Sequence, residues 1–461
     1  MMPYKDDSSS DNFQNRIKTL SNDIDLIHTT DISNEISFII SNFDQINEKE
    51  NQKEILIFLK IVSNVDYPST ISTLSSFPLI DFLLVHYQIP LFEDEKEIFI
   101  EIIGLLLKNS DQNKSEDLLN FFLSQLLNYN PKIDQNTNFL YHLLYGTYQF
   151  FSENFSEKFC QISFFEKLIQ FYNLAPEIDI LLIQFALESS KSFKLNPEII
   201  QFILFSLQFY NEETADLISY LIYCTYKRDP GILRNDLAKE TLVRCISNTD
   251  NFDSQKYSLK LLSRLDENDI QFLNYNTIII DSIFKIFEKS KNNNNQLLLF
   301  AIPVVYRALQ LSLSLAELLF FDTEKNRDLT LFISETILTN NYKLRNWGIL
   351  VFSQIMRNLP RKIYPFLVKP ELQKLFYNIL TTVIEVDENE DSLIIFMTSI
   401  DGLIKVLSTD ENLLFNLISI LQRDEILQKI SELSNSENEE LSATFQMISE
   451  NLSLILENLS S

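Results

Sequence analysis

The sequence contains very little glycine, only five residues in a chain of 461. Sheet-rich folds and phosphate-binding loops both use glycine for turns with positive φ. By contrast, hydrophobic residues make up 45% of the chain, and short polar stretches separate the apolar segments. The composition therefore argues against a sheet-rich fold and against a nucleotide-binding loop. It favours packed helices around a large core.

Cysteine and histidine are equally scarce. The three cysteines are Cys160, Cys224 and Cys245. The three histidines are His28, His86 and His142. The odd number and wide spacing of the cysteines predict reduced, buried thiols in a cytoplasmic or nuclear protein. No histidine has a partner at a metal-ligating spacing, and no pattern indicates a nucleophile with its base. We therefore expect no metal, no cofactor and no enzymatic activity.

Acidic runs are present but lack the layout of a calcium loop. They are Glu93–Glu95, Asp387–Asp391 and Glu437–Glu440. An EF-hand loop needs alternating acids, a central glycine and a closing glutamate at fixed positions. We expect these runs to be solvated loop charge.

Basic residues are outnumbered, with 38 Lys and Arg against 64 Asp and Glu, which gives a net charge of −26. A general nucleic-acid binder would show a basic face, and an acidic membrane surface would repel this chain. The longest apolar run, Leu297–Tyr306, is half the length of about 20 residues that a bilayer-spanning helix needs. We therefore expect neither nucleic acid nor membrane as a partner. Residues 1–12 are polar and serine-rich, which predicts a disordered tail.

The stretch Tyr342–Pro360 predicts one buried helix. Trp347, Val351 and Ile355 follow the three- and four-residue steps of a single helical stripe, which Leu350 and Leu359 complete. The neighbouring Ile349, Phe352 and Met356 widen this stripe, so other helices must cover it on two sides. Pro360 is expected to end the helix.

Similar apolar helices recur along the chain. Their aligned starts are Ile57, Ile98, Asn138, Ile180, Asp216, Lys256, Leu297, Asn346, Ser392 and Thr444. The steps lie between 36 residues (Ile180 to Asp216) and 52 residues (Ser392 to Thr444). A second helix precedes nearly every one, and at Asn196-Pro197-Glu198 it carries a clear start signal. Such units bury their apolar faces by stacking. We expect one all-α, right-handed superhelical solenoid of about ten helix pairs over residues 13–461.

Units such as Ile162–Ser190, Leu237–Leu265 and Asp328–Leu359 resemble armadillo/HEAT-type helical repeats. The resemblance covers Glu54–Leu459 and leaves armadillo versus HEAT open, because the glycine common between armadillo helices is mostly absent. It implies a non-catalytic scaffold or adaptor that binds a protein or an extended peptide. A regulatory subunit of a phosphatase- or kinase-type complex and a karyopherin-like carrier are the alternatives. Importin-α-type proteins carry repeated Trp and Asn, whereas this chain has one tryptophan.

Charge is distributed unevenly near the C-terminal end. Residues 385–461 carry 16 acidic and 3 basic residues, a net of −13, and predict a solvated acidic cap. Residues 343–374 carry seven basic residues against Glu371 alone, a net of +6. We call these residues the basic island. Its candidate partner-binding residues are Lys343, Arg345, Trp347, Arg357, Arg361 and Lys362. The island is expected either to dock an acidic segment of a partner or to serve internal electrostatics.

Overall fold

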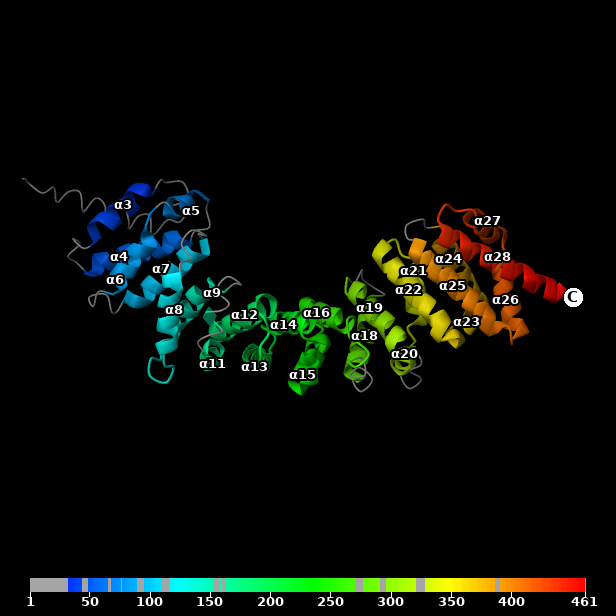
Figure 1. The fold of residues 1–461 in the computed structure, drawn as a ribbon, viewed down its shortest axis with the longest axis horizontal. Coiled ribbons are helices and arrows are strands. Elements are labelled where there is room, and N and C mark those ends of the chain that lie inside the picture. The colour runs from blue at the N-terminus through cyan, green and yellow to red at the C-terminus, as the bar shows by residue number, and fades with distance from the viewer. Residues whose placement is uncertain are drawn as a thin grey trace, which may run out of the picture. The chain divides into compact units, whose positions relative to one another are not determined.

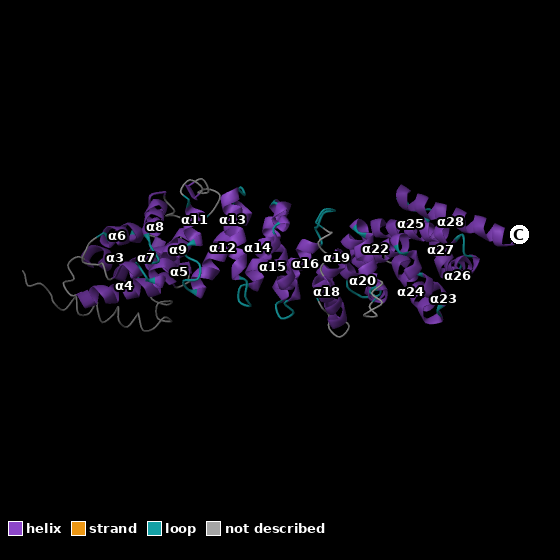
Figure 2. Cartoon of the chain, turned by 90° about the horizontal axis from the view of Figure 1, so that it is seen from below, coloured by secondary structure: helices purple, strands orange, loops and turns teal. Residues whose placement is uncertain are grey.

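The computed structural model describes residues 32–43, 49–64, 68–75, 77–88, 95–109, 116–151, 158–159, 163–269, 277–290, 296–320, 328–385 and 390–460. Over these ranges the chain forms α-helices and short 3-10 helices, without any strand (Figure 1, Figure 2). The prediction of an all-α protein is confirmed. The predicted tail, His28, Cys160 and parts of two acidic runs (residues 93–94 and 387–389) lie outside the described residues.

The chain divides into two compact units, Met1–Tyr210 and Asn211–Ser461, which we call the N-terminal and C-terminal units. The N-terminal unit contains α3 (Ser33–Asn42), α4 (Lys49–Asn64), α5 (Pro68–Ser75), α6 (Leu79–Tyr87), α7 (Lys96–Asn109), α8 (Glu116–Asn128), α9 (Thr137–Tyr148), α11 (Phe164–Ile169), α12 (Pro176–Ser192), α13 (Pro197–Ser206) and the 3-10 helix η5 (Leu207–Phe209).

The C-terminal unit begins with α14 (Ala215–Arg228), η6 (Pro230–Arg234), α15 (Asp236–Ser247), α16 (Phe252–Leu262), α18 (Thr277–Ser290), α19 (Leu298–Leu311) and α20 (Leu313–Phe320). It continues with α21 (Thr330–Ile337), α22 (Tyr342–Asn358), η7 (Pro360–Lys362), α23 (Tyr364–Val368), α24 (Pro370–Glu385), α25 (Glu390–Leu407), α26 (Glu411–Leu421), α27 (Asp424–Leu433) and α28 (Glu439–Ser460).

All ten recurring helices predicted from the sequence are present. They are α4, α7, α9, α12, α14, α16, α19, α22, α25 and α28, which we call the repeat helices. In the N-terminal unit α4, α7, α9 and α12 contact one another in that order. In the C-terminal unit α14, α16, α19, α22, α25 and α28 do the same, as can be followed from green to red in Figure 1. Most repeat helices thus pack mainly on a repeat helix about 40 residues away, whereas α12 packs mainly on α13.

Preceding helices cover the repeat helices from one side. The helices α6, α8, α15, α18 and α21 each pack against the repeat helix that follows. The start signal at α13 is as expected, because Asn196 Oδ1 accepts a hydrogen bond from the Ile199 backbone N–H at 2.8 Å. The short helices α5, α20, α23 and α27 were not predicted, since segments of five to ten residues carry too little periodicity to stand out.

Polar contacts join successive repeat helices at the same 40- to 50-residue step. Arg307 Nε donates to the Leu265 carbonyl at 2.9 Å, which ties α19 to the turn that follows α16. Asn358 Nδ2 donates to the Leu309 carbonyl at 2.8 Å, which ties α22 to the end of α19. Carbonyl groups at or just beyond the end of a helix have no hydrogen-bond partner within that helix, and leaving them buried and unpaired costs free energy. The Arg307 and Asn358 side chains provide the missing donors.

The helix predicted from Tyr342–Pro360 is α22, and it ends at Asn358 before Pro360 opens η7. Val351, Ile355 and Phe352 are fully buried, as expected. Trp347 and Leu350 are only half-buried, which differs from the predicted stripe. The difference arises because α21 packs closely on the side that carries Gly348, and this rotates Trp347 toward the edge of the contact with α19.

Within the described ranges, none of the helices combines the length and the apolar character that crossing a membrane requires.

Candidate interaction surface

The structure distributes the six candidate residues of the basic island over several environments. Lys343 is exposed in the first turn of α22. Arg345 donates two hydrogen bonds, at 3.2 and 2.9 Å, to the carbonyl of Thr339 just beyond α21. Arg357 donates from Nε to Ser399 Oγ on α25 at 2.8 Å. Arg345 and Arg357 therefore join helices of the fold itself.

Trp347 packs against the ring of Tyr306 on the preceding repeat helix, α19. Its ring centroid lies 5.7 Å from that of Tyr306 on α19, with an interplanar angle of 62°. Edge-to-face pairs of this kind contribute about 0.5–1.5 kcal/mol beyond their buried area. Because both side chains are only half-buried, they also present aromatic surface to solvent.

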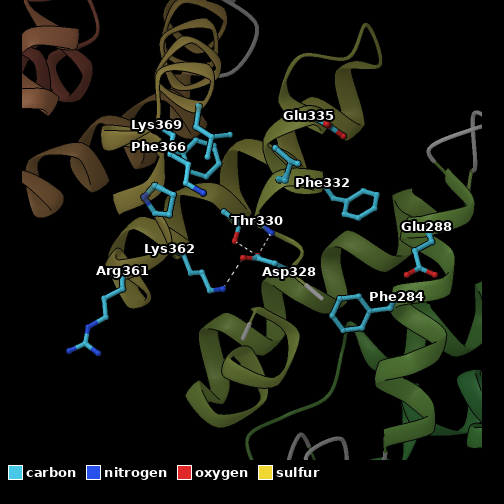
Figure 3. A pocket seen from close by; sticks show the side chains of 13 residues that line it. Phe284, Glu288, Asp328, Thr330, Phe332, Glu335, Arg361, Lys362, Phe366 and Lys369 are labelled. Atoms are coloured by element: carbon cyan, nitrogen blue, oxygen red, sulfur yellow. Dashed lines mark hydrogen bonds and ion pairs between the residues drawn. The ribbon is translucent and has the colours of Figure 1, made fainter. Parts of the chain in front are cut away.

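Arg361 and Lys362 line a pocket of about 580 Å³ in the C-terminal unit (Figure 3). Lys362 Nζ makes an ion pair with Asp328 Oδ2 at 2.8 Å. Asp328 also accepts hydrogen bonds from the backbone N–H and the hydroxyl of Thr330, at 2.8 and 2.5 Å. The ion pair thus fastens η7 to the start of α21.

The charges around this pocket are mixed in sign. The lining includes Arg361, Lys362 and Lys369 as well as Asp328, Glu288 and Glu335, and in Figure 3 Lys362 points toward Asp328 whereas Arg361 points away from it. Phe284 and Phe366 also line the pocket and are almost fully buried. A pocket with three cations and three carboxylates offers no net preference for a ligand of either sign. It is therefore the weaker of two candidates in this unit.

The stronger candidate is a run of aromatic and basic side chains on α14, on α16 and just beyond α16, all half-buried except the exposed Arg264. Its members are Tyr220, Tyr223, Tyr257, Lys256, Lys260 and Arg264, which we call the tyrosine–lysine face. The ring centroids of Tyr220 and Tyr257 are 4.4 Å apart, and those of Tyr223 and Tyr257 are 6.1 Å apart. The rings therefore bridge from one repeat helix to the next.

The cations of this face lie over its rings. Lys256 Nζ is 4.8 Å and Lys260 Nζ 5.4 Å from the Tyr257 centroid, and the Arg264 guanidinium is 5.2 Å from that of Tyr223. Lys260 also reaches α19, where Phe300 lies 5.1 Å away. The electron-rich ring faces attract these cations and fix their positions.

The pKa values of Lys256, Lys260 and Tyr220 on this face are shifted by different causes. The hydrogen bond that Lys256 Nζ donates to Asp253 Oδ1, at 2.7 Å, raises the pKa of Lys256. Burial lowers the pKa of Lys260, and the positive charges of Lys256 and Arg264 lower it further. On α14 the Cys224 thiol, together with burial, raises the pKa of Tyr220 to about 12. The tyrosine hydroxyl is therefore a neutral hydrogen-bond donor at neutral pH.

Sequence analysis missed the tyrosine–lysine face, although the repeat step contains its signal. Tyr220 and Tyr257 are 37 residues apart, Tyr223 and Arg264 are 41 apart, and Lys260 and Phe300 are 40 apart. Each separation is close to one repeat, so these side chains meet on neighbouring repeat helices. The basic island attracted notice because its charges are adjacent in sequence, which is a poorer guide to proximity in stacked helices.

The histidines and cysteines that the structure describes occupy ordinary positions. His86 is buried, and its Nδ1 lies 2.8 Å from the Phe82 carbonyl. His142 Nε2 lies 3.4 Å from Glu101 Oε2, which also pairs with Lys60 at 2.6 Å. Cys245 is fully buried, and Cys224 is half-buried. In the part of the chain that the structure describes, no three His, Cys, Asp or Glu side chains are placed to hold a metal ion.

Comparison with known proteins gives little more. No protein-family model and no curated protein sequence matches the chain. Among solved structures, it is similar to a chain from the work described as "A conserved phosphorylation switch controls the interaction between cadherin and beta-catenin in vitro and in vivo". That likeness has a TM-score of 0.49 and 10% sequence identity, and it covers 98% of this chain and 97% of the other. A likeness this weak carries no conclusion about partner or activity.

Proposed function

We propose that this protein is a non-catalytic scaffold, built as an armadillo- or HEAT-like right-handed solenoid, that binds an extended segment of another protein. The binding surface would be the exposed side of the repeat helices α14, α16, α19 and α22. A regulatory subunit or a karyopherin-like carrier would use the same kind of surface and would differ in the partner bound.

One observation supports the proposal most directly. On four successive repeat helices, half-buried rings and cations form two sets of contacts. The first runs from Tyr220 on α14 to Tyr257 and Lys260 on α16 and then to Phe300 on α19, and the second joins Tyr306 on α19 to Trp347 on α22. Aromatic side chains that keep one face in contact with solvent are the usual anchors of protein interfaces.

Helix spacing makes an extended peptide a suitable ligand. Packed helices lie about 8–10 Å apart, and an extended chain advances about 3.3 Å per residue. A peptide of about ten residues would therefore cross α14, α16, α19 and α22, contacting a new helix with every third residue. A surface made of helices also leaves the peptide backbone free to keep its own conformation and hydration.

The proposal is tested by selecting peptides from a random library displayed on phage, with the full chain as bait. Binders would be mapped by hydrogen exchange on the complex. We expect protection on the exposed sides of the helices from α14 to α22. A failure to obtain any specific binder, or a footprint confined to the pocket lined by Arg361 and Lys362, would contradict the proposal.

A further inference from the structure

Three cations of the tyrosine–lysine face lie within two turns of α16 and its end. Lys256 and Lys260 are four residues apart on α16, so they point to the same side of the helix, and Arg264 follows four residues later, just beyond the helix end. Like charges at this spacing destabilise a helix. The tyrosine and phenylalanine rings that they contact offset part of this repulsion.

Only one of the three cations is neutralised by a carboxylate among the described residues. Lys256 pairs with Asp253 at 2.7 Å, whereas Lys260 and Arg264 form no ion pair there. This is unusual in a chain with a net charge of −26, where acidic side chains outnumber basic ones. The fold thus concentrates positive charge on one surface without providing a full set of counter-charges.

The surroundings of Lys260 are unfavourable for its positive charge. Its side chain is half-buried between Tyr257 and Phe300, and burial with two positive neighbours lowers its pKa. A partly desolvated ammonium gains more from a new anionic partner than an exposed one does. A ligand carboxylate placed beside Lys260 would therefore relieve an electrostatic penalty that the free protein carries.

We propose that the tyrosine–lysine face binds an acidic, extended segment of a partner protein. Carboxylates of the segment pair with Lys260 and Arg264, and its side chains lie over the rings of Tyr220, Tyr223 and Tyr257. This inference rests on the proposed function and adds the chemistry of the partner. The guanidinium of Arg264 is suited to bidentate pairing, and the tyrosine hydroxyls provide further donors.

A protein segment fits the face better than a nucleic acid does. Single-stranded nucleic acid also combines stacking with charge, but it needs a basic groove that follows a phosphate at every nucleotide. Here three cations are confined to α16 and the turn after it, within an acidic chain that repels a polyanion over longer distances. A peptide with a few carboxylates requires no more positive charge than this face has.

The test measures binding of three fluorescent probes to the full chain by anisotropy. The first is a peptide of about ten residues that alternates glutamate with leucine and tyrosine, the second has lysine in place of glutamate, and the third is oligouridylate of equal length. The variant carries Lys256→Gln, Lys260→Gln and Arg264→Gln. The matched control carries Lys132→Gln, Lys285→Gln and Lys289→Gln, which remove the same charge from other exposed positions.

We expect the glutamate peptide to bind wild-type protein and the control alike, and the face variant to bind at least about ten-fold more weakly. Affinity of the wild type should also fall between about 50 and about 500 mM salt, because mobile ions screen the carboxylate–cation pairs. An equal loss in the control variant would overturn the inference. So would tighter binding of the lysine peptide or of oligouridylate.

A second measurement covers the case in which the face variant does not fold. In a Cys160→Ser background, Cys224 lies one turn from Tyr220 on α14 and reports on this face. The glutamate peptide should slow alkylation of Cys224 at least about three-fold, and the lysine peptide should not. Equal rates with and without the glutamate peptide would count against the inference.

The two proposals fail in different ways. If library peptides map to the repeat helices but are neutral or basic, the scaffold function stands and the acidic partner is wrong. If no peptide maps there, the scaffold function itself is wrong.

Discussion

Gly348 on α22 lies so close to Thr336 on α21 that a Cβ atom at Gly348 would come within 2.4 Å of Thr336 Oγ1. The Ile337 side chain and backbone are the next atoms, at 3.0 and 3.3 Å. No side chain larger than hydrogen fits there without moving one helix. The absence of a side chain is therefore what allows α21 and α22 to approach each other.

Replacing this glycine should destabilise the protein. We expect Gly348→Ala to lower the free energy of unfolding by about 1–3 kcal/mol, because the added methyl group overpacks the crossing of two helices. The measurement is urea denaturation followed by circular dichroism.

Gly402 on α25 is the matched control, since a Cβ there would meet nothing within 4 Å. Gly402→Ala should raise the free energy of unfolding by up to about 1 kcal/mol, because alanine favours the helix interior more than glycine does. The same sign for both substitutions would contradict the packing argument.

Arg345 should matter for stability, whereas the nearby Lys343 should not. Arg345→Met removes two hydrogen bonds to the Thr339 carbonyl and should lower the free energy of unfolding by about 1–2 kcal/mol. Lys343 is exposed and has no ion pair with any described residue, so Lys343→Met should change the free energy of unfolding by less than about 0.5 kcal/mol. Thermal unfolding of both variants checks this. Equal changes in the free energy of unfolding for the two variants would mean that the basic island affects stability through its total charge and not through the hydrogen bonds of Arg345.

His142 should make stability depend on pH. Burial lowers its pKa more than the carboxylates of Glu101 and Glu97 raise it, and Lys60 adds to the lowering. Histidine in an unfolded chain has a pKa of about 6.5. The unfolded state therefore binds the proton more tightly, and the free energy of unfolding falls as the pH drops through about 6.5 toward the folded pKa.

We expect urea midpoints to decline between about pH 7.5 and about pH 5.5, and His142→Gln to decline less steeply. His28 and His86 are present in both proteins, so the difference between the two slopes isolates His142. Identical slopes would show that this histidine does not have a lowered pKa.

The two described thiols should react at very different rates. Cys245 is fully buried, and burial raises its pKa to about 12, so hardly any thiolate forms near neutral pH. Cys224 is half-buried on α14. In a Cys160→Ser protein, iodoacetamide should modify Cys224 in the native state, and Cys245 only after denaturant is added. Native modification of Cys245 would indicate local opening of α15.

The sequence by itself determined where the repeat helices lie. All ten helices appear at the predicted positions, α22 ends before Pro360, and Asn196 caps α13. These features depend on the periodicity of apolar residues and on local capping, both of which act within a few turns. The division into an N-terminal and a C-terminal unit and the short helices between repeats were not predicted, because few local residues specify them.

Only the tertiary structure decided which charged residues form a surface. Arg345 and Lys362 are close in sequence, yet one caps a helix end and the other pairs with Asp328. Lys260 and Tyr220 are 40 residues apart, yet both belong to the tyrosine–lysine face. The physical reason is that stacking brings together residues one repeat apart. The direction in which each side chain points depends on how its helix is rotated about its own axis. Close contacts between helices, such as that of Gly348 with Thr336, fix this rotation.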